Sequence, residues 1–283
     1  MPTLFETYKN AISKLANKSK DEINIRLLLC ANNGLNSMSE FYLKRNEDIH
    51  DLPKFESQFQ RFLDGEPIDY IIGETEFFGS KFNVDRRVLI PRSESEEVAS
   101  FAYRKIIKIY GDKPIALADI CSGSGCLGIS LAKHLKLNSL YLSDISKDAN
   151  EVATSNLLKN HVDGYVLLGD ALNPLIKHGI KVDVIIANPP YILNKNEVDK
   201  SVLDYEPHKA LFTSERLDVY RSILMDAPKV MNDELLIIFE IGYDLKDRLI
   251  KLISELNYPC QFSFSKDING KYRILSLLIS SKI

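Results

Sequence analysis

The segment Val182-Asp183-Val184-Ile185-Ile186-Ala187-Asn188-Pro189-Pro190-Tyr191 joins an apolar run to a pair of prolines. Its β-branched first part, Val182–Ala187, predicts a strand that is buried on both faces of a parallel sheet. The prolines end this strand, because proline fixes its own φ and has no N–H to donate to a ladder. Asn188 and Tyr191 are therefore expected at the carboxyl end of a strand, where ligands of open α/β sheets bind.

These two side chains are suited to holding a planar NH₂ group. The side-chain carbonyl of Asn188 and a neighbouring backbone carbonyl can accept its two hydrogens. The ring of Tyr191 can pack against its flat face. The alternative is a purely structural proline turn covered by an aromatic ring, so the rest of the sequence has to decide between the two interpretations.

The composition indicates a globular protein without a nucleic-acid or membrane partner. The chain has 283 residues, of which 45% are hydrophobic and 27% charged, enough for one large domain or two unequal ones. Its net charge of −3 gives no overall attraction to phosphate backbones, so no stable nucleic-acid binding is expected. Apolar runs such as Leu235–Phe239 are too short to span a bilayer, and the N-terminal segment lacks the apolar core of a signal peptide. A cytoplasmic protein is predicted.

The cysteines give no sign of a metal site. They number 4 and form neither CxxC pairs nor zinc-ligand spacings: Cys30, Cys121, Cys126 and Cys260. Reduced thiols are expected, as in other cytosolic proteins.

Residues 1–74 are expected to form a helical domain. Apolar side chains recur at helical spacing up to about residue 64, and Ser37 and Asp51 are expected to begin two of the helices. Gly65-Glu66-Pro67 ends the helical pattern. Because the domain contains no cluster of reactive side chains, packing or recognition of a partner is its expected role.

Residues 75–91 are expected to form a β-hairpin that links two domains. The strand-like runs Thr75–Phe78 and Lys81–Val84 flank Gly79-Ser80, in which glycine is expected at the first position of the turn.

Residues 92–283 predict an α/β domain with a seven-stranded, mostly parallel, doubly wound sheet. Ser93 is expected to cap a first helix that runs to about Tyr110, with Glu96 at the capping-box position. Further along, apolar strand-like runs alternate with helical patterns, which is typical of a parallel sheet covered on both faces. The last two strands are joined through Asn269-Gly270 and should form an antiparallel hairpin. The expected strands are Ile115–Ile120, Ser139–Ser143, Tyr165–Leu168, Val182–Ala187, Leu235–Ile241, Gln261–Ser265 and Arg273–Ile279, with helices near 125–135, 146–159, 216–230 and 244–256.

A glycine-rich loop follows the first expected strand of this sheet. Gly123, Gly125 and Gly128 match the pattern G-x-G-x-x-G between a strand and a helix. Asp144 follows at the end of the next strand, where a ribose-binding carboxylate is expected. By itself this pattern favours a dinucleotide such as NAD, but other nucleoside cofactors on a doubly wound sheet can use the same arrangement.

Two acidic residues favour a different nucleoside cofactor. Asp119 lies just before the glycines, where its charge disfavours a pyrophosphate and suits the cationic amino-acid end of S-adenosylmethionine. Asp170, after the third strand, is placed to accept a hydrogen bond from an adenine amino group. Each carboxylate alone could be a solvated loop end or a helix cap. Together with the Asn188–Tyr191 segment, which no hydride transfer requires, they favour S-adenosylmethionine.

Over nearly its whole length the sequence resembles the HemK/PrmC family of protein-(glutamine-N5) methyltransferases, which modify peptide chain release factors. The Gly-Glu-Pro and Ile-Pro-Arg segments are the most specific of the shared motifs, whereas Asn-Pro-Pro-Tyr also occurs in adenine-N6 methyltransferases. The motifs are Gly65-Glu66-Pro67-Ile68, Tyr70-Ile71-Ile72-Gly73, Glu76-Phe77-Phe78-Gly79, Leu89-Ile90-Pro91-Arg92, the glycine loop, Asp144-Ile145-Ser146, Asn188–Tyr191, Tyr205-Glu206-Pro207 and Phe239-Glu240-Ile241-Gly242.

The resemblance implies a class I S-adenosylmethionine-dependent fold and specific site residues. It assigns the catalytic role to Asn188, Pro189 and Tyr191, and contact with the substrate glutamine to all of Asn188–Tyr191. Release factors become the expected substrate, the helical domain is expected to recognise them, and a monomer is expected. The cofactor contacts that it implies are Cys121, Ser122, Gly123, Ser124, Gly125, Asp144, Ala171 and Asn188, in addition to Asp119 and Asp170.

The sequence departs from the family pattern in its cofactor loop. It has Cys121-Ser122-Gly123 where Gly-Thr-Gly is usual, and Ala171 where an aromatic residue sometimes covers the adenine. A loop with cysteines also occurs in the sister family that modifies a ribosomal protein, which is the nearest alternative. An NAD-dependent oxidoreductase and a non-catalytic protein that binds translation factors are the alternatives from other classes.

The expected chemistry is an in-line methyl transfer without a dedicated general base. The 5 histidines are scattered, and only His208, after Glu206-Pro207, lies near a motif. Accepting both N–H hydrogens of an amide would hold its nitrogen opposite the methyl group and stabilise the positive charge that develops on it.

Overall fold

The computed structural model describes residues 1–15 and 18–280, and the chain divides into two compact units, Met1–Gly73 and Glu74–Ile283. In the first unit, Ser37 and Asp51 cap helices through their side chains, as predicted. A short helix, Ile68–Ile72, was not predicted; it begins after Pro67 and ends at Gly73, which adopts a left-handed conformation. The helices are α1 (Leu4–Ser13), α2 (Lys18–Asn32), α3 (Met38–Leu43), α4 (Leu52–Leu63) and α5 (Ile68–Ile72).

A two-stranded hairpin opens the second unit. Strands β1 (Glu74–Phe77) and β2 (Ser80–Asn83) pair so that Phe77 lies opposite Ser80. The turn therefore consists of Phe78 and Gly79, both with positive φ (49° and 71°), which is the type I′ arrangement. The prediction that glycine would take the first turn position is wrong: Phe78 takes it, and its N–H donates to Glu96 Oε1 at 2.7 Å.

The same glutamate explains a second error, at the start of helix α6 (Ser93–Tyr110). Arg92 is the N-cap and Ser93 is already helical, so the predicted capping box does not form. Glu96 bonds the hairpin turn instead of the backbone before the helix.

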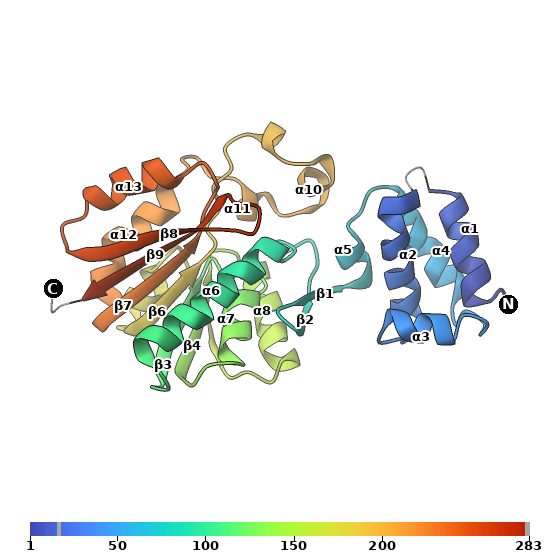
Figure 1. Cartoon of the computed structure of the whole chain (residues 1–283), viewed down its shortest axis with the longest axis horizontal. Coiled ribbons are helices and arrows are strands. Elements are labelled where there is room, and N and C mark those ends of the chain that lie inside the picture. The colour runs from blue at the N-terminus through green and yellow to red at the C-terminus, as the bar shows by residue number, and fades with distance from the viewer. Residues whose placement is uncertain (16–17, 281–283) are drawn as a thin grey trace. The chain divides into compact units, whose positions relative to one another are not determined.

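Seven strands form the main sheet in the order β5-β4-β3-β6-β7-β9-β8 (Figure 1). Within this sheet β3 to β7 are parallel, and β8 and β9 form the antiparallel hairpin that the sequence predicted; β9 also runs antiparallel to β7. The strands are β3 (Ile115–Ile120), β4 (Leu137–Asp144), β5 (Tyr165–Leu168), β6 (Val182–Ala187), β7 (Met231–Glu240), β8 (Cys260–Lys266) and β9 (Tyr272–Ser280).

Helices cover both faces of this sheet (Figure 1). Apolar side chains of α6, α7 (Cys126–Ala132) and α8 (Lys147–Lys159) form one core with the hairpin, and those of α9 (Asn173–Lys177), α12 (Asp218–Val230) and α13 (Lys246–Ser254) form another. The short helices between β6 and α12 were not predicted; they are η1 (Lys195–Glu197), α10 (Lys200–Tyr205) and α11 (His208–Leu211). Among the described residues, no helix meets the length and apolarity that a membrane span requires.

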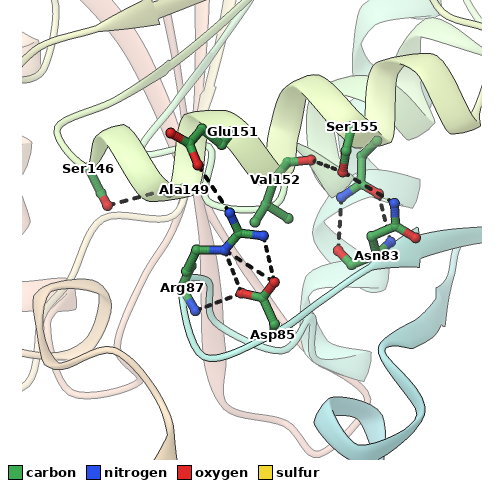
Figure 2. A network of polar contacts seen from close by, with 9 residues as sticks. Asn83, Asp85, Arg87, Ser146, Ala149, Glu151, Val152 and Ser155 are labelled. Atoms are coloured by element: carbon green, nitrogen blue, oxygen red, sulfur yellow. Dashed lines mark hydrogen bonds and ion pairs between the residues drawn. The ribbon is translucent and has the colours of Figure 1, made fainter.

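The hairpin is anchored to helix α8 by polar contacts (Figure 2). The Asn83 side chain donates to Ser155 Oγ at 3.2 Å, and Arg87 bonds both Asp85 and Glu151. These bonds fix the chain that leads from the hairpin toward α6.

The strand order reverses between β3 and β6. The chain runs outward from β3 to β4 and β5 and then returns, so that β6 lies beside β3 on its other side. The loops that follow these strands therefore lie side by side at the carboxyl edge, where doubly wound sheets bind ligands.

Candidate functional site

The Asn188–Tyr191 segment leaves the centre of the sheet at this crossing point. The residue before it, Ala187, lies opposite Ile120 of β3 and Phe239 of β7. Pro189 is buried, while Asn188, Pro190 and Tyr191 are half-buried. The segment thus lies beside the glycine loop, as the sequence predicted from the strand ends.

Two glycines allow helix α7 to pack closely against the sheet. A Cβ on Gly128 would lie 2.8 Å from both Asp119 Cβ and Leu142 Cδ2, and one on Gly125 would lie 2.9 Å from Leu142 Cδ1. Such distances are far shorter than van der Waals contact, so a larger residue would push the helix away. Gly123 has no atom within 4 Å of where its Cβ would be, so the space above this part of the loop is open.

Cys121 occupies a position of the loop that favours glycine. Its φ is +58°, in the left-handed region that costs a residue with a Cβ about 1–2 kcal/mol. Burial raises the pKa of its thiol well above the ordinary value, and it raises that of Cys126 to about 12. Both thiols stay protonated at neutral pH, so neither is an activated nucleophile.

Asp119 lies beneath the loop with 1% of its surface exposed. Its Oδ2 accepts a hydrogen bond from Gly128 N–H at 2.8 Å, while Oδ1 is buried without a hydrogen-bond partner. Burial raises the pKa of this carboxyl to about 7; the Gly128 N–H lowers it in part, and the charge of Asp144 raises it. The negative charge that the sequence predicted at Asp119 therefore belongs to a carboxyl group whose pKa is near neutrality.

Asp144 ties the glycine loop to the end of β4. Its Oδ2 accepts from Gly123 N–H and its Oδ1 from Ser146 N–H, both at 2.9 Å. Burial raises its pKa, and these backbone N–H groups lower it in part. The carboxylate thus holds the loop from the adjacent strand and keeps lone pairs that can accept further bonds.

The last two predicted cofactor contacts follow β5 and differ in exposure. Asp170 is exposed, whereas Ala171 is 5% exposed and belongs to the core on the α12 side of the sheet. Ala171 has a φ of +46°, so it is, after Cys121, a second non-glycine residue with a left-handed backbone at this edge.

Asn156 connects the glycine loop to the hairpin and was not identified from the sequence. It is fully buried on α8. Its Oδ1 accepts from Asn83 N–H at 2.6 Å, and its Nδ2 donates to the carbonyls of Asn83 at 3.0 Å and Ser124 at 2.9 Å. One amide thus satisfies backbone groups of both segments.

Glu240, the last residue of β7, is a buried acid next to Asn188 that the sequence interpretation left without a role. It is 4% exposed, and its Oε2 accepts from Ser95 Oγ at 2.6 Å. Burial raises the pKa of Glu240, while the Ser95 hydroxyl and the neighbouring Asn188 side chain lower it in part. Its position in the apolar run Leu235–Ile241 was the only signal in the sequence.

The chain just after Glu240 supports Tyr191. A Cβ on Gly242 would lie 3.0 Å from Tyr191 Cδ2, so only glycine lets the ring occupy this place without a shift. Burial raises the pKa of the Tyr191 hydroxyl, as does the charge of Glu240, whereas the nearby Arg273 lowers it. The phenol therefore stays neutral and packs as a ring.

The Ile-Pro-Arg and Tyr-Glu-Pro motifs meet in space. Glu206 is buried and accepts from Ile90 N–H at 3.2 Å and from the guanidinium of Arg92. Arg86 lies 4.7 Å from the ring centroid of Tyr205. These contacts fasten the chain that follows Tyr191 to the chain that leads into α6.

Histidine and metal chemistry find no support in the described parts of the chain. His208 bonds the carbonyl of Leu203 at 2.9 Å, an ordinary structural role. Residues 1–15 and 18–280 contain no group of three or more metal-ligating side chains.

Comparison with known proteins agrees with this geometry. The family model of the methyltransferase small domain matches residues 109–232, and that of the PrmC N-terminal domain matches residues 6–73. With the sheet order and the glycine loop, these matches define a class I S-adenosylmethionine-dependent methyltransferase. The release factor glutamine methyltransferase of Bacillus subtilis (strain 168) is 35% identical over 285 residues, which cover 99% of each chain. The chain belongs to the release factor glutamine methyltransferase family.

Two further relatives extend the comparison. The release factor glutamine methyltransferase of Staphylococcus aureus (strain NCTC 8325 / PS 47) is 37% identical over 243 residues, covering 84% of this chain and 86% of that protein. The crystal structure of ribosomal protein L11 methylase from Lactobacillus delbrueckii subsp. bulgaricus is 19% identical, with a TM-score of 0.50 over 67% of this chain and 80% of that one. The latter confirms the methyltransferase fold.

Proposed function

We propose that this protein transfers a methyl group from S-adenosylmethionine to the side-chain amide nitrogen (N5) of a glutamine in the glycine-rich loop of a peptide chain release factor. The observation that carries the proposal is the Asn188–Tyr191 segment beside a glycine loop in a chain that shares 35% identity with a release factor glutamine methyltransferase over 99% of both lengths.

The residues at the carboxyl ends of β3, β4 and β5 fit this cofactor. The orphaned Oδ1 of Asp119 can attract the ammonium group of the amino-acid end, and the space beside Gly123 is open. Asp144 would bind the ribose hydroxyls, and Asp170 with Ala171 would lie near the adenine. The remaining proposed contacts are Cys121, Ser122, Ser124, Gly125 and Asn188. When bound, S-adenosylmethionine supplies an electrophilic methyl group on a sulfonium.

The Asn188–Tyr191 segment would hold the glutamine. Asn188 and the backbone at Pro189 would accept the two N–H hydrogens, while Pro190 and the Tyr191 ring confine the flat amide. An amide nitrogen is a poor nucleophile, because it is conjugated with its carbonyl; the rotation barrier of about 18–20 kcal/mol indicates the size of that conjugation. Two accepted hydrogen bonds stabilise positive charge on the nitrogen as the methyl arrives, and the proton can leave afterwards to water.

The proposal extends to partners and location. The helical unit would recognise the release factor, with residues 75–91 as a linker to the catalytic domain 92–283. The protein would work as a monomer in the cytoplasm, without stable nucleic-acid binding, which the net charge of −3 supports.

Intact mass spectrometry tests the proposal. A release factor incubated with this protein and S-adenosylmethionine should gain the mass of one CH₂ unit, because a methyl group replaces a hydrogen, and fragmentation should place the methyl group on a glutamine side chain. The same factor with that glutamine replaced by glutamate is the control. A ribosomal protein methylated in place of the release factor would refute the substrate assignment.

A further inference from the structure

We propose that Glu240 is a positioning residue that turns the Asn188 amide so that its carbonyl oxygen faces the substrate. The inference rests on the proposed methyl transfer to an amide nitrogen. It gives a role to a buried carboxylate directly behind the Asn188–Tyr191 segment.

Strand register places the two side chains together. Ala187 of β6 and Phe239 of β7 are direct partners in the parallel ladder. Asn188 and Glu240 follow these partners, so they are the next neighbours across the strands and point to the same face. Glu240 is 4% exposed, and its Oε2 is held by the hydroxyl of Ser95 at 2.6 Å. The hydroxyl thus fixes the carboxylate behind Asn188.

The chemistry of the two groups then decides the orientation of the amide. An asparagine can present either its carbonyl or its NH₂ group to a ligand, and the two differ by a half-turn of the side chain. An ionised carboxylate only accepts hydrogen bonds. Glu240 therefore draws the NH₂ group of Asn188 toward itself and leaves the carbonyl free to accept from a substrate NH₂ group. In the reversed orientation, the Asn188 carbonyl would face the carboxylate of Glu240, which is also an acceptor, and the Asn188 NH₂ group would face the substrate NH₂ group, which is also a donor.

The end of β7 also positions the other half of the segment. Gly242 lies against the Tyr191 ring, where a Cβ would come within 3.0 Å of Cδ2. Glu240 and Gly242 thus contact the two substrate-facing residues from behind. Several titratable or charged groups interact electrostatically with Glu240. They are Glu94 on α6, Cys126 on α7, Tyr191, Tyr220 on α12 and Arg273 on β9.

Glu240→Gln is the direct test, because glutamine keeps the shape and can still accept from Ser95. It can donate as well as accept, so it no longer selects one orientation of Asn188. We expect kcat for release-factor methylation to fall roughly ten- to a hundredfold, with little change in KM, in cofactor affinity or in melting temperature. Glu234→Gln is the matched control: Glu234 lies on the same strand and bonds Ser280 at 3.2 Å. It should leave kcat unchanged.

The pH profile separates positioning from a purely structural role. At saturating cofactor, kcat of the wild-type protein should fall as the pH drops through the raised pKa of Glu240, because a neutral carboxyl group can donate to the Asn188 carbonyl. The kcat of Glu240→Gln should not show this fall at low pH, although a fall caused by the protonation of Asp119 would remain. Ser95→Ala removes a hydrogen bond that lowers the pKa of Glu240, so it should move the limb to higher pH.

A readout independent of activity keeps this inference distinct from the proposed function. The side-chain ¹⁵NH₂ resonance of Asn188 can be assigned from its loss in Asn188→Asp. In the wild-type protein it should be shifted from the position of a free asparagine and protected from hydrogen exchange. In Glu240→Gln its chemical shift and its protection should both change. If the Asn188 resonance behaves in this way but the release factor is not methylated, the proposed function is overturned and the positioning role of Glu240 is not. An Asn188 resonance that is identical in the wild-type protein and Glu240→Gln would overturn the positioning role.

Discussion

The protonation of Asp119 depends on folding. Its pKa rises from an ordinary value near 4 to about 7 because it is buried beneath the glycine loop. A raised pKa favours the protonated folded state, so this contribution to stability is fully present below pH 4 and is lost as the pH rises through 7.

We therefore expect Asp119→Asn to stabilise the cofactor-free protein above pH 7, by on the order of a few kcal/mol, with little effect at pH 4. Urea unfolding at a series of pH values measures the difference. Asp112→Asn, at a side chain that is 91% exposed, serves as the control and should change little at any pH. A constant difference between wild type and Asp119→Asn across the pH range would contradict the buried-charge account.

Asp144 offers a second prediction at this scale. Asp144→Ala removes an acceptor for the ribose and also the anchor of Gly123 N–H, each a charge-assisted bond worth about 1.5–3 kcal/mol. Cofactor affinity should fall about tenfold or more while the fold persists. Isothermal calorimetry with S-adenosylhomocysteine gives the dissociation constant, and a value equal to that of wild type would remove Asp144 from the site.

At the scale of elements, one side chain of helix α8, Asn156, bonds both the hairpin and the glycine loop. Asn156→Ala should leave the Ser124 carbonyl and the Asn83 backbone unsatisfied, which costs about 1–3 kcal/mol for each buried group. We expect both a lower melting temperature and a several-fold weaker affinity for the cofactor, although Asn156 does not contact the proposed cofactor site.

Asn160→Ala is the matched control for that experiment. Asn160 lies one turn further along the chain. Its side chain donates to the Lys81 carbonyl of the hairpin at 3.0 Å and to its own helix, and it accepts from Lys133 at the end of α7, but it makes no bond to the glycine loop. It should weaken the attachment of the hairpin without affecting cofactor affinity. Equal cofactor affinities for the two variants would show that Asn156 does not set the loop geometry.

The elements also show which features the sequence could predict. The strands Ile115–Ile120, Tyr165–Leu168 and Val182–Ala187 were predicted to the residue, because apolar runs between turns define buried strands well. Helices such as α5 and α10, with 5 and 6 residues, are shorter than the window in which helical periodicity can be recognised.

The candidate site was predictable only where its parts are adjacent in the sequence. The glycine loop and the Asn188–Tyr191 segment are continuous motifs at strand ends, so their positions followed from the strand pattern. The role of Glu240 did not, because its partner Ser95 is 145 residues away. The bond between Arg92 and Glu206 joins motifs separated by 114 residues. Such pairs arise from tertiary structure, which periodicity does not describe.

At the scale of the whole molecule, the helical unit and the catalytic unit should contribute different steps. The first unit has its own core, which includes Ile25, Leu28 and Phe41, and the part of it that the structure describes contains none of the proposed cofactor residues. A protein that begins at Glu74 should bind S-adenosylhomocysteine with the affinity of the full chain but methylate intact release factor much more slowly. A short glutamine peptide is the control and should react equally with both forms. Equal rates on the intact factor would show that the helical unit does not recognise it.

The most direct test of the central claim offers both kinds of NH₂ group in one reaction. Adenine in a duplex has to be extruded at a cost of a few kcal/mol and its strand held by basic residues. This chain has a net charge of −3, and Lys195 and Lys200 near Tyr191 alternate with Glu197 and Asp199. With tritiated S-adenosylmethionine, release factor and duplex DNA in one tube, all label should enter the release factor, and Asn188→Ala should abolish it. Label in the DNA and none in the protein would contradict the account.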